Sequence, residues 1–206
     1  MKHLSTKTYG HNIGLSCAFR QWRADSHCRL LHGYALAFKF TFEADELDAR
    51  NWVVDFGSMK SLKGTLERTF DHTTIVAEDD PELDWFKEAE ARGILRLIVL
   101  PAGGCEKFAE YVFGVTEIWL TDNGYSPRVK LRSVEVMEHG ANSAMAEAAS
   151  VSPMFVGTVF PNAGTVPLCQ PPTVAQAAME YSIASPDVNV ADVVAAIERA
   201  EARYEG

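Results

Sequence analysis

Residues 34–44, YALAFKFTFEA, constrain the fold of this chain most, because every second side chain from Leu36 onward is apolar. Successive side chains of a strand point to opposite faces of a sheet, so this alternation predicts a long strand with one face in the core. Residues 8–19 also alternate and predict an antiparallel neighbour. We therefore expect a sheet built around these two segments.

Three segments carry the spacing of amphipathic helices. In the first of them, Met59, Leu62, Leu66 and Phe70 recur three or four positions apart. Helices are predicted at 58–70, 81–93 and 105–120, and further strands at 51–57, 96–100 and 129–137. This order of elements predicts an α+β fold rather than a regular alternation of strand and helix.

The composition changes beyond residue 148. Five prolines lie between residues 153 and 172, and they exclude a continuous helix there. Residues 190–205 then carry a narrow apolar stripe at helical spacing. We expect one globular domain over residues 1–148 and a proline-rich arm over residues 149–206 that ends in a helix.

Charge and cysteine content limit the partners and the location. The 206 residues include 19 basic and 28 acidic ones, a formal net charge of −9, which disfavours non-specific binding to nucleic acid or to an anionic membrane. No run of about 20 apolar residues is present, and the first residues lack the apolar stretch of a secretory signal. Four widely spaced cysteines without a CxxC pair indicate reduced thiols. We expect a cytoplasmic protein without nucleic-acid or membrane partners.

The densest group of reactive side chains lies in the segment SHCRLLHGY, where Cys28 stands four positions before His32. The basic residues near this cysteine are Arg23, His27 and Arg29. Such neighbours favour a thiolate, which can act as a nucleophile or as an acid–base group. Spacing alone, however, favours a small buried cysteine and a hydrogen-bonded turn histidine.

Four acidic or basic side chains outside this segment are further candidates. Asp71 precedes His72 at a predicted helix end, where a carboxylate can orient an imidazole and raise its basicity. Glu138 follows the last predicted strand of the domain, where it can accept two N–H groups from a guanidine-like ring edge. Glu106 starts a predicted helix, where a first-turn charge is favourable and ligand contact is the lesser expectation. The Asp71–His72 pair and Glu138 are equally compatible with ordinary solvent-exposed residues that have no function.

The order of these segments resembles a known family. The segments CRLLHGY, WVVDFGSMKSLKGTLERTFDH, GCEKFAEYV and VEVMEH follow one another as in the 6-carboxytetrahydropterin and 6-pyruvoyltetrahydropterin synthases. The resemblance covers residues 8–143 and not the proline-rich part. It implies a T-fold, an antiparallel sheet with helices on one face. It also implies that subunits join through strand edges into a homo-oligomer, expected to be a hexamer, with pterin sites between subunits.

The resemblance also implies roles for single residues. Cys28 matches the catalytic cysteine of the family, and Asp71 and His72 match its acid–base pair. Glu138 matches the carboxylate that holds the pterin ring, and Glu106 falls on a helix-start glutamate of the pocket.

The implied activity is that of a carbon–carbon and carbon–oxygen lyase that converts 7,8-dihydroneopterin triphosphate to 6-carboxytetrahydropterin, in the pathway to 7-deazaguanine and queuosine. Arg20, Arg23 and Arg29 are expected to bind the triphosphate. One alternative is another T-fold reaction, such as epimerisation or retro-aldol cleavage of dihydroneopterin, which needs no metal. Another is a non-catalytic pterin- or purine-binding or assembly module.

The zinc site of the family is altered in this sequence. The resemblance implies three histidine ligands, but Phe19 and Tyr34 stand at two of these positions, and only His32 is kept. Catalytic zinc normally has three protein ligands and one open position. Either a displaced zinc site uses Cys17, His27 and His32, or the metal is lost and the Tyr34 hydroxyl takes its place.

Overall fold

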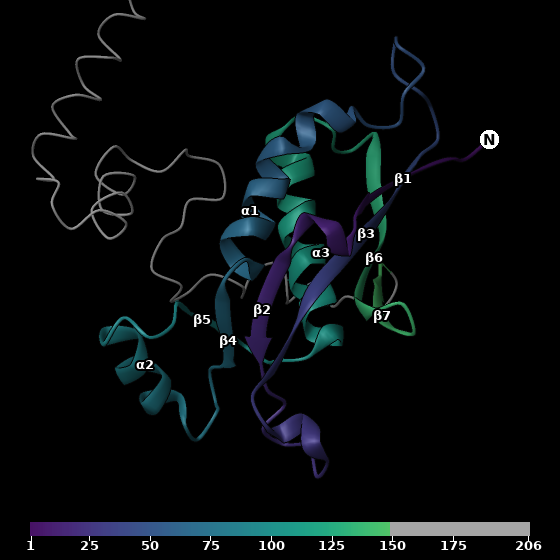
Figure 1. Ribbon diagram of the computed structural model, residues 1–206. Coiled ribbons are helices and arrows are strands. Elements are labelled where there is room, and N and C mark those ends of the chain that lie inside the picture. The colour runs from purple at the N-terminus through teal and green to yellow at the C-terminus, as the bar shows by residue number, and fades with distance from the viewer. Residues whose placement is uncertain (149–206) are drawn as a thin grey trace, which may run out of the picture. The chain divides into compact units, whose positions relative to one another are not determined.

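The computed structural model describes residues 1–148, which form a sheet with helices packed on it (Figure 1). The strands are β1 (His3–Tyr9), β2 (Leu15–Phe19), β3 (His32–Ala44), β4 (Thr73–Ala77), β5 (Leu97–Leu100), β6 (Val129–His139) and β7 (Asn142–Glu147). The helices are α1 (Lys60–Phe70), α2 (Leu83–Ala91) and α3 (Cys105–Asp122), with short 3-10 turns η1 (His11–Ile13), η2 (His27–Arg29) and η3 (Phe56–Met59). The expected α+β class is confirmed.

The long strand β3 joins the two halves of the sheet, whose order is β5-β4-β2-β3-β6-β7 with β1 also paired to β3. The first part of β3 pairs with β2, with His32 opposite Phe19 and Leu36 opposite Leu15. The second part pairs with β1 on the same edge and with β6 on the other. The two ends of β3 therefore lie in different halves of the sheet.

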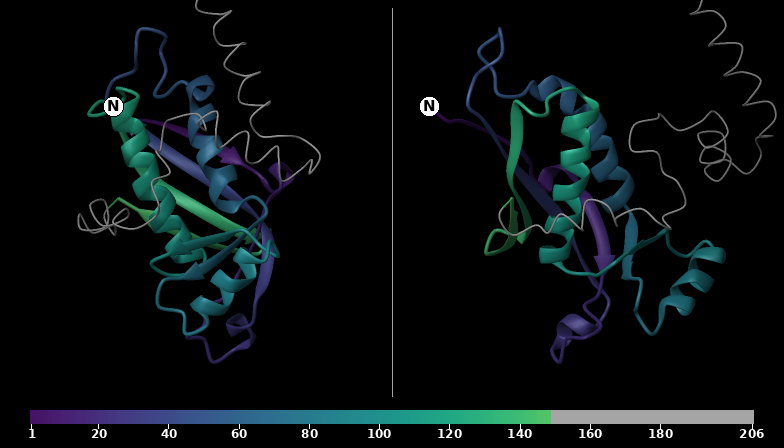
Figure 2. Two further views of the ribbon diagram at one scale, coloured as in Figure 1. Left: turned by 90° about the vertical axis from the view of Figure 1, so that its left-hand side faces the viewer. Right: turned by 180° about the vertical axis from the view of Figure 1, so that it is seen from behind.

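The core lies between the sheet and the helices α1 and α3, which cover the same face (Figure 2). The predicted alternation in β3 is confirmed, because Leu36, Phe38, Phe40 and Phe42 are fully buried. The Phe70 ring of α1 lies 4.8 Å from the Phe38 ring and 5.5 Å from the Phe108 ring of α3. These aromatic contacts fasten both helices to the sheet.

The sheet differs from the expected one in its strand directions and in three added strands. It is mixed rather than antiparallel throughout, since β4 runs parallel to β2 and to β5. Strands β1, β4 and β7 were not predicted. Every residue of β4 is buried, so this strand has no polar alternation. Strands β1 and β7 carry mostly polar or small side chains.

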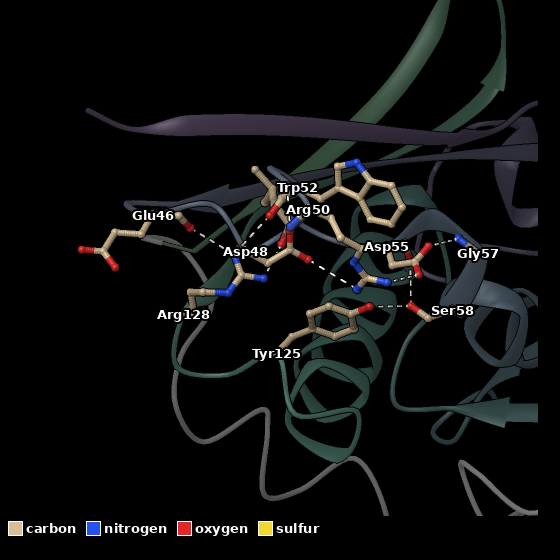
Figure 3. Close-up of polar contacts among 10 residues, drawn as sticks. Glu46, Asp48, Arg50, Trp52, Asp55, Gly57, Ser58, Tyr125 and Arg128 are labelled. Carbon is tan, nitrogen blue, oxygen red and sulfur yellow. Dashed lines mark hydrogen bonds and ion pairs between the residues drawn. The ribbon is translucent and has the colours of Figure 1, made fainter.

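The predicted strand at 51–57 is wrong, because side chains fold this segment into turns (Figure 3). The Asp48 carboxylate accepts hydrogen bonds from the backbone N–H groups of Arg50 (2.8 Å) and Trp52 (2.9 Å). The guanidinium of Arg128 donates to the carbonyl oxygens of Glu46 (3.0 Å), Trp52 (3.3 Å) and Val53 (2.8 Å). The backbone is thereby satisfied without a strand partner.

The expected domain boundary and the helix over residues 190–205 lie outside the described residues and stay predictions. Among residues 1–148, no helix is long and apolar enough to cross a membrane.

Candidate functional site

The three positions at which the resemblance implies zinc ligands lie together at the carboxyl end of β2. The Phe19 ring lies 5.0 Å from the His32 ring and 6.2 Å from the Tyr34 ring, and His32 and Tyr34 are 5.8 Å apart. Phe108 of α3 packs against Phe19 at 5.1 Å. These four residues are called the aromatic cluster below. Phe19 and Phe108 are buried, and Tyr34 is half-buried.

The family's zinc does not fit the aromatic cluster, because Phe19 has no donor atom at the first ligand position. Burial raises the pKa of the Cys17 thiol to about 12, so zinc binding at this residue would have to displace the thiol proton. Within residues 1–148, no three or more His, Cys, Asp or Glu side chains are grouped to hold a metal ion. A displaced zinc site of Cys17, His27 and His32 stays a prediction for metal analysis.

Residues 20–31, called the Cys28 loop below, connect β2 to β3. Ser26 caps the turn η2, with its hydroxyl accepting from the backbone N–H of Cys28 at 3.3 Å. The Cys28 carbonyl accepts from the backbone N–H of Gln21 at 2.9 Å, which closes the loop. Cys28 is half-buried, and its neighbours His27 and Arg29 are exposed.

Glycines bring the start of α3 against the Cys28 loop. A Cβ atom on Gly103 would lie 2.9 Å from the Arg20 carbonyl oxygen, and one on Gly104 would lie 2.1 Å from Nε2 of Gln21. Gly104 also has a φ of 104°, which side chains rarely allow. The approach therefore depends on the absence of side chains at both positions.

Glu138 lies beside the first residue of α3, where β6 leaves β3. The last residue of β6 that pairs with β3 is Met137, opposite Ala37, and the pairing of β6 with β7 shifts its register between Met137 and His139. The Cys105 thiol donates to Oε1 of Glu138 at 3.6 Å. Burial and the nearby carboxylate raise the pKa of this thiol, so it stays a proton donor. The Cys28 loop, the aromatic cluster and Glu138 thus lie at the same end of the sheet.

Asp71 and His72 lie at the opposite end of β2. The backbone N–H of His72 donates to the Ser16 carbonyl oxygen at 2.8 Å, and β4 begins with the next residue. Nδ1 of His72 is 2.6 Å from the Asp71 carboxylate, as expected for an oriented imidazole. The His72 side chain is 88% exposed. From Ser16 to Phe19, the last residue before the Cys28 loop, the strand spans about 10 Å, and the pair lies at the other end of it.

The remaining predicted residues lie on the first turn of α3 and in the Cys28 loop, and several residues that were not predicted contact them or Glu138. Glu106 is exposed on the first turn of α3. Arg20 and Arg23 form ion pairs with Asp80 and Asp79, respectively. Neither these two aspartates nor Cys105 was predicted from the sequence. The acidic run EDDPELD over residues 78–84 is the signal that points to the aspartates.

Known proteins match this chain over most of the described residues. The model of the family described as 6-pyruvoyl tetrahydropterin synthase matches residues 11–149. The 6-carboxy-5,6,7,8-tetrahydropterin synthase of Aquifex aeolicus is 27% identical over 160 residues, covering 70% of this chain and 97% of the relative. The enzyme of the same name from Rickettsia bellii is 39% identical over 57 residues, covering 27% of this chain and only 41% of the relative.

One solved structure shows the same fold. An uncharacterized protein from Wolinella succinogenes superimposes with a TM-score of 0.61 at 19% identity, covering 72% of this chain and 99% of that protein. The expected T-fold is confirmed, with the sheet mixed as described. Because the family match spans more than half of the sequence, this chain belongs to the 6-pyruvoyl tetrahydropterin synthase family.

Proposed function

We propose that this chain is a lyase that cleaves the C6 side chain of a 7,8-dihydropterin. The observation that carries the proposal is the placement of Glu138, a half-buried carboxylate at the end of β6 that lies beside a thiol donor and at the same end of the sheet as Cys28. The name 6-carboxy-5,6,7,8-tetrahydropterin synthase, printed for both relatives, supports it. The reduced cysteines expected from the sequence fit a cytoplasmic enzyme.

Each residue has a definite task in this proposal. The Glu138 carboxylate accepts two N–H groups of the pterin ring edge and so fixes the ring. The Cys28 thiol moves a proton at the side chain of the substrate. Asp71 orients the His72 imidazole, which exchanges the second proton. No step of this scheme uses a metal.

Two reactions on the C6 side chain fit these residues. The names of the relatives favour conversion of 7,8-dihydroneopterin triphosphate to 6-carboxytetrahydropterin, which feeds 7-deazaguanine and queuosine synthesis. The aromatic cluster favours retro-aldol cleavage of dihydroneopterin, because Phe19 removes a metal ligand that such a cleavage does not need. Product identity distinguishes the two.

We also propose that the protein works as a homo-oligomer, with a hexamer as the expected size. The exposed Asp71 and His72 pair and the Cys28 loop lie at opposite ends of β2, which favours a site completed by a second copy. Strands β1 and β7 each leave one edge without a strand partner within residues 1–148. Unpaired edges are ready for pairing between chains. A stable monomer in light scattering at micromolar concentration would contradict this.

The test is incubation of the full chain with 7,8-dihydroneopterin triphosphate and, separately, with 7,8-dihydroneopterin, followed by mass spectrometry of the products. Zinc is quantified on the same sample. Zinc near one per subunit that is lost in Cys17→Ser supports the displaced site. A zinc-free active protein that is damaged by Tyr34→Phe supports the loss of the metal.

Glu138→Gln serves as the binding control in this test. The variant should weaken pterin binding by about 1.5 to 3 kcal/mol, the range for hydrogen bonds to charged groups. Glu135→Gln, on the same strand, is the matched variant that should leave binding unchanged. Tight pterin binding without turnover would favour the non-catalytic binding module, and absence of both would reject the proposed function.

A further inference from the structure

We infer that Cys105 is a positioning residue for pterin binding, which holds the Glu138 carboxylate in the orientation that receives the edge of the pterin ring. The inference rests on the proposed function and deepens it, because it names a residue that acts on the ring through Glu138. It follows from the surroundings of the Cys105 thiol at the start of α3.

The Cys105 thiol is a buried hydrogen-bond donor. It donates to Oε1 of Glu138 at 3.6 Å, and the cysteine is only 6% exposed. Burial and the Glu138 carboxylate raise the pKa of the thiol, so the sulfur keeps its proton at neutral pH. A protonated thiol is a poor nucleophile but can still donate a hydrogen bond. Cys105 therefore serves Glu138 as a donor rather than the substrate as a nucleophile.

Glu138 gains from such a contact because a glutamate side chain has several rotamers. Met137, directly before it, is the last residue of β6 that pairs with β3. The Glu138 side chain is half-buried, and each rotamer would point its carboxylate in a different direction. A contact that selects one rotamer before the ligand arrives removes an ordering cost from binding. The hydrogen bond from Cys105 thus preorganises the carboxylate.

The contact with the thiol leaves the carboxylate able to bind a ring edge. A carboxylate has two oxygens with about four lone-pair sites between them. The thiol uses one site, on Oε1 of Glu138, so each oxygen retains a site for one N–H group of the ring. Binding two parallel N–H groups depends on the orientation of the carboxylate plane. The thiol restricts that orientation without competing for the ligand.

The start of α3 is itself held against the Cys28 loop. A Cβ atom on Gly104 would lie 2.1 Å from Nε2 of Gln21, so the helix start and the loop are in close contact. Cys105 is the next residue and the first of α3. The loop therefore lies on one side of this short stretch and Glu138 on the other. Through Cys105, the start of α3 sets the position of Glu138 relative to the Cys28 loop.

The test is calorimetric titration of the full chain with neopterin, a stable oxidised pterin. Cys105→Ala removes the donor and should weaken neopterin binding by about three- to tenfold, the effect of one intramolecular hydrogen bond. Cys105→Ser replaces the thiol by a hydroxyl, which is also a donor, and should keep the affinity within about twofold of the parent. Both variants reduce the side-chain volume, so the difference between them reports the donor. Equal weakening in both would overturn the inference.

A second arm asks whether Cys105 acts through the carboxylate. Two residues that work through one contact have non-additive effects. In a Glu138→Gln background, Cys105→Ala should change the neopterin affinity by less than about twofold, because a neutral amide gains less from a donor than a carboxylate does. The same loss of affinity in both backgrounds would overturn the inference.

Thr116→Val is the matched control on the same helix. Thr116 is fully buried, and its hydroxyl donates to the Val112 carbonyl oxygen at 2.7 Å. It lies about 16 Å along α3 from Cys105. Valine removes this buried donor and should leave neopterin affinity unchanged. A loss equal to that of Cys105→Ala would overturn the inference, because any loosening of α3 would then suffice.

The remaining outcomes separate the inference from the proposed function. A parent chain that does not bind neopterin would reject the proposed pterin site, and the inference with it. Binding that Glu138→Gln weakens and Cys105→Ala leaves unchanged would overturn the inference alone. Urea unfolding verifies that each variant folds, and Cys105→Val, which fills the space without a donor, replaces Cys105→Ala if the alanine variant does not.

Discussion

The two ends of β2 carry the candidate chemistry, but they are built in opposite ways. At the carboxyl end, the aromatic cluster, the Cys28 loop, the start of α3 and Glu138 crowd together. At the amino end, Asp71 and His72 stand in the open, held to the sheet by one backbone hydrogen bond to Ser16. The crowded end has the means to hold a ring, and the open end has only an acid–base pair.

This difference fits the proposal that one chain holds two unlike halves of a site rather than one whole site. The half that binds a ligand needs a lined pocket, and several elements must pack together to line it. A proton-transferring half needs only an oriented imidazole that remains accessible. In the proposed oligomer, the open end of one copy meets the crowded end of another.

The largest expected effect comes from disabling each half separately. Cys28→Ala and His72→Asn should each lower turnover by about 10²- to 10⁴-fold, the usual contribution of an acid–base group. Asparagine is chosen because His72 has a φ of 53°, which asparagine tolerates. In the proposed oligomer the halves come from different copies, so oligomers that contain both variants should regain a fraction of the activity, measured after co-expression with two different tags.

The control replaces one partner by the double variant. Mixed oligomers of Cys28→Ala with the Cys28→Ala, His72→Asn chain should stay inactive, since no pair of copies then supplies an intact Cys28. Inactive mixed oligomers of the two single variants, once shown by tag capture to contain both chains, would place both halves of the site in one copy.

A smaller effect, on stability, is expected from adding a side chain between β2 and β3 at the crowded end. A Cβ atom on Gly33 would lie 2.4 Å from the Cys17 carbonyl oxygen, a backbone atom that cannot turn away. Gly33→Ala should therefore separate β2 from β3 and lower the free energy of unfolding by about 2 to 3 kcal/mol, as overpacking does. Urea unfolding measures it.

Gly114 supplies the matched control for this substitution. It lies inside α3 with nothing within 4 Å of an added Cβ. Gly114→Ala should stabilise the protein by about 0.5 to 1 kcal/mol, because alanine favours a helix. Equal effects of the two substitutions would show that β2 and β3 are not in close contact at Gly33.

The smallest effect concerns the charge pair that anchors the Cys28 loop. Burial opposes ionisation of Asp80, but the hydrogen bonds from Arg20 and from the Glu82 N–H outweigh it and hold its pKa below the ordinary value. The pKa of Asp80 is lower in the folded protein than in the unfolded protein, where it is about 4. Ionised Asp80 therefore stabilises the fold at pH values above about 4, and this stabilisation is lost as the pH falls through the pKa of the folded protein. Asp80→Asn should cost about 1 to 2 kcal/mol at pH 7.

The same variant gives the pH test. The difference in unfolding free energy between the parent and Asp80→Asn should be constant above about pH 5 and should shrink in more acidic solution. A difference that does not change down to the lowest pH at which the protein folds would mean that the ionised Asp80 does not anchor the loop. His72→Asn, at the open end, should leave stability nearly unchanged.

Local patterns were enough to predict the elements that build the crowded end. The alternation of Leu36, Phe38, Phe40 and Phe42 predicted β3, and the helical spacing ending at Phe70 predicted α1. These patterns are informative because one face of each element is buried and the other is not. The roles of Cys28 and Glu138 came from the resemblance and stay predictions.

The features that the sequence did not predict depend on contacts between distant segments. Strand β4 is buried throughout, so its residues show no period of two. The pairing of Arg20 with Asp80 joins residues 60 positions apart, and nothing near Arg20 in the sequence reveals it. The close approach of Gly104 to Gln21 likewise becomes visible only once α3 and the Cys28 loop are placed in space.

The free edges of β1 and β7 also bear on how the protein is made. Until β1 and β7 find the partners that the proposed oligomer gives them, a newly folded chain displays unpaired backbone groups along both strands, and any other extended polypeptide competes for them. Assembly speeds up with the concentration of folded copies, whereas capture by misfolded chains is irreversible. Soluble yield in a cell should therefore be set by the rate at which copies meet, more than by the stability of the single subunit.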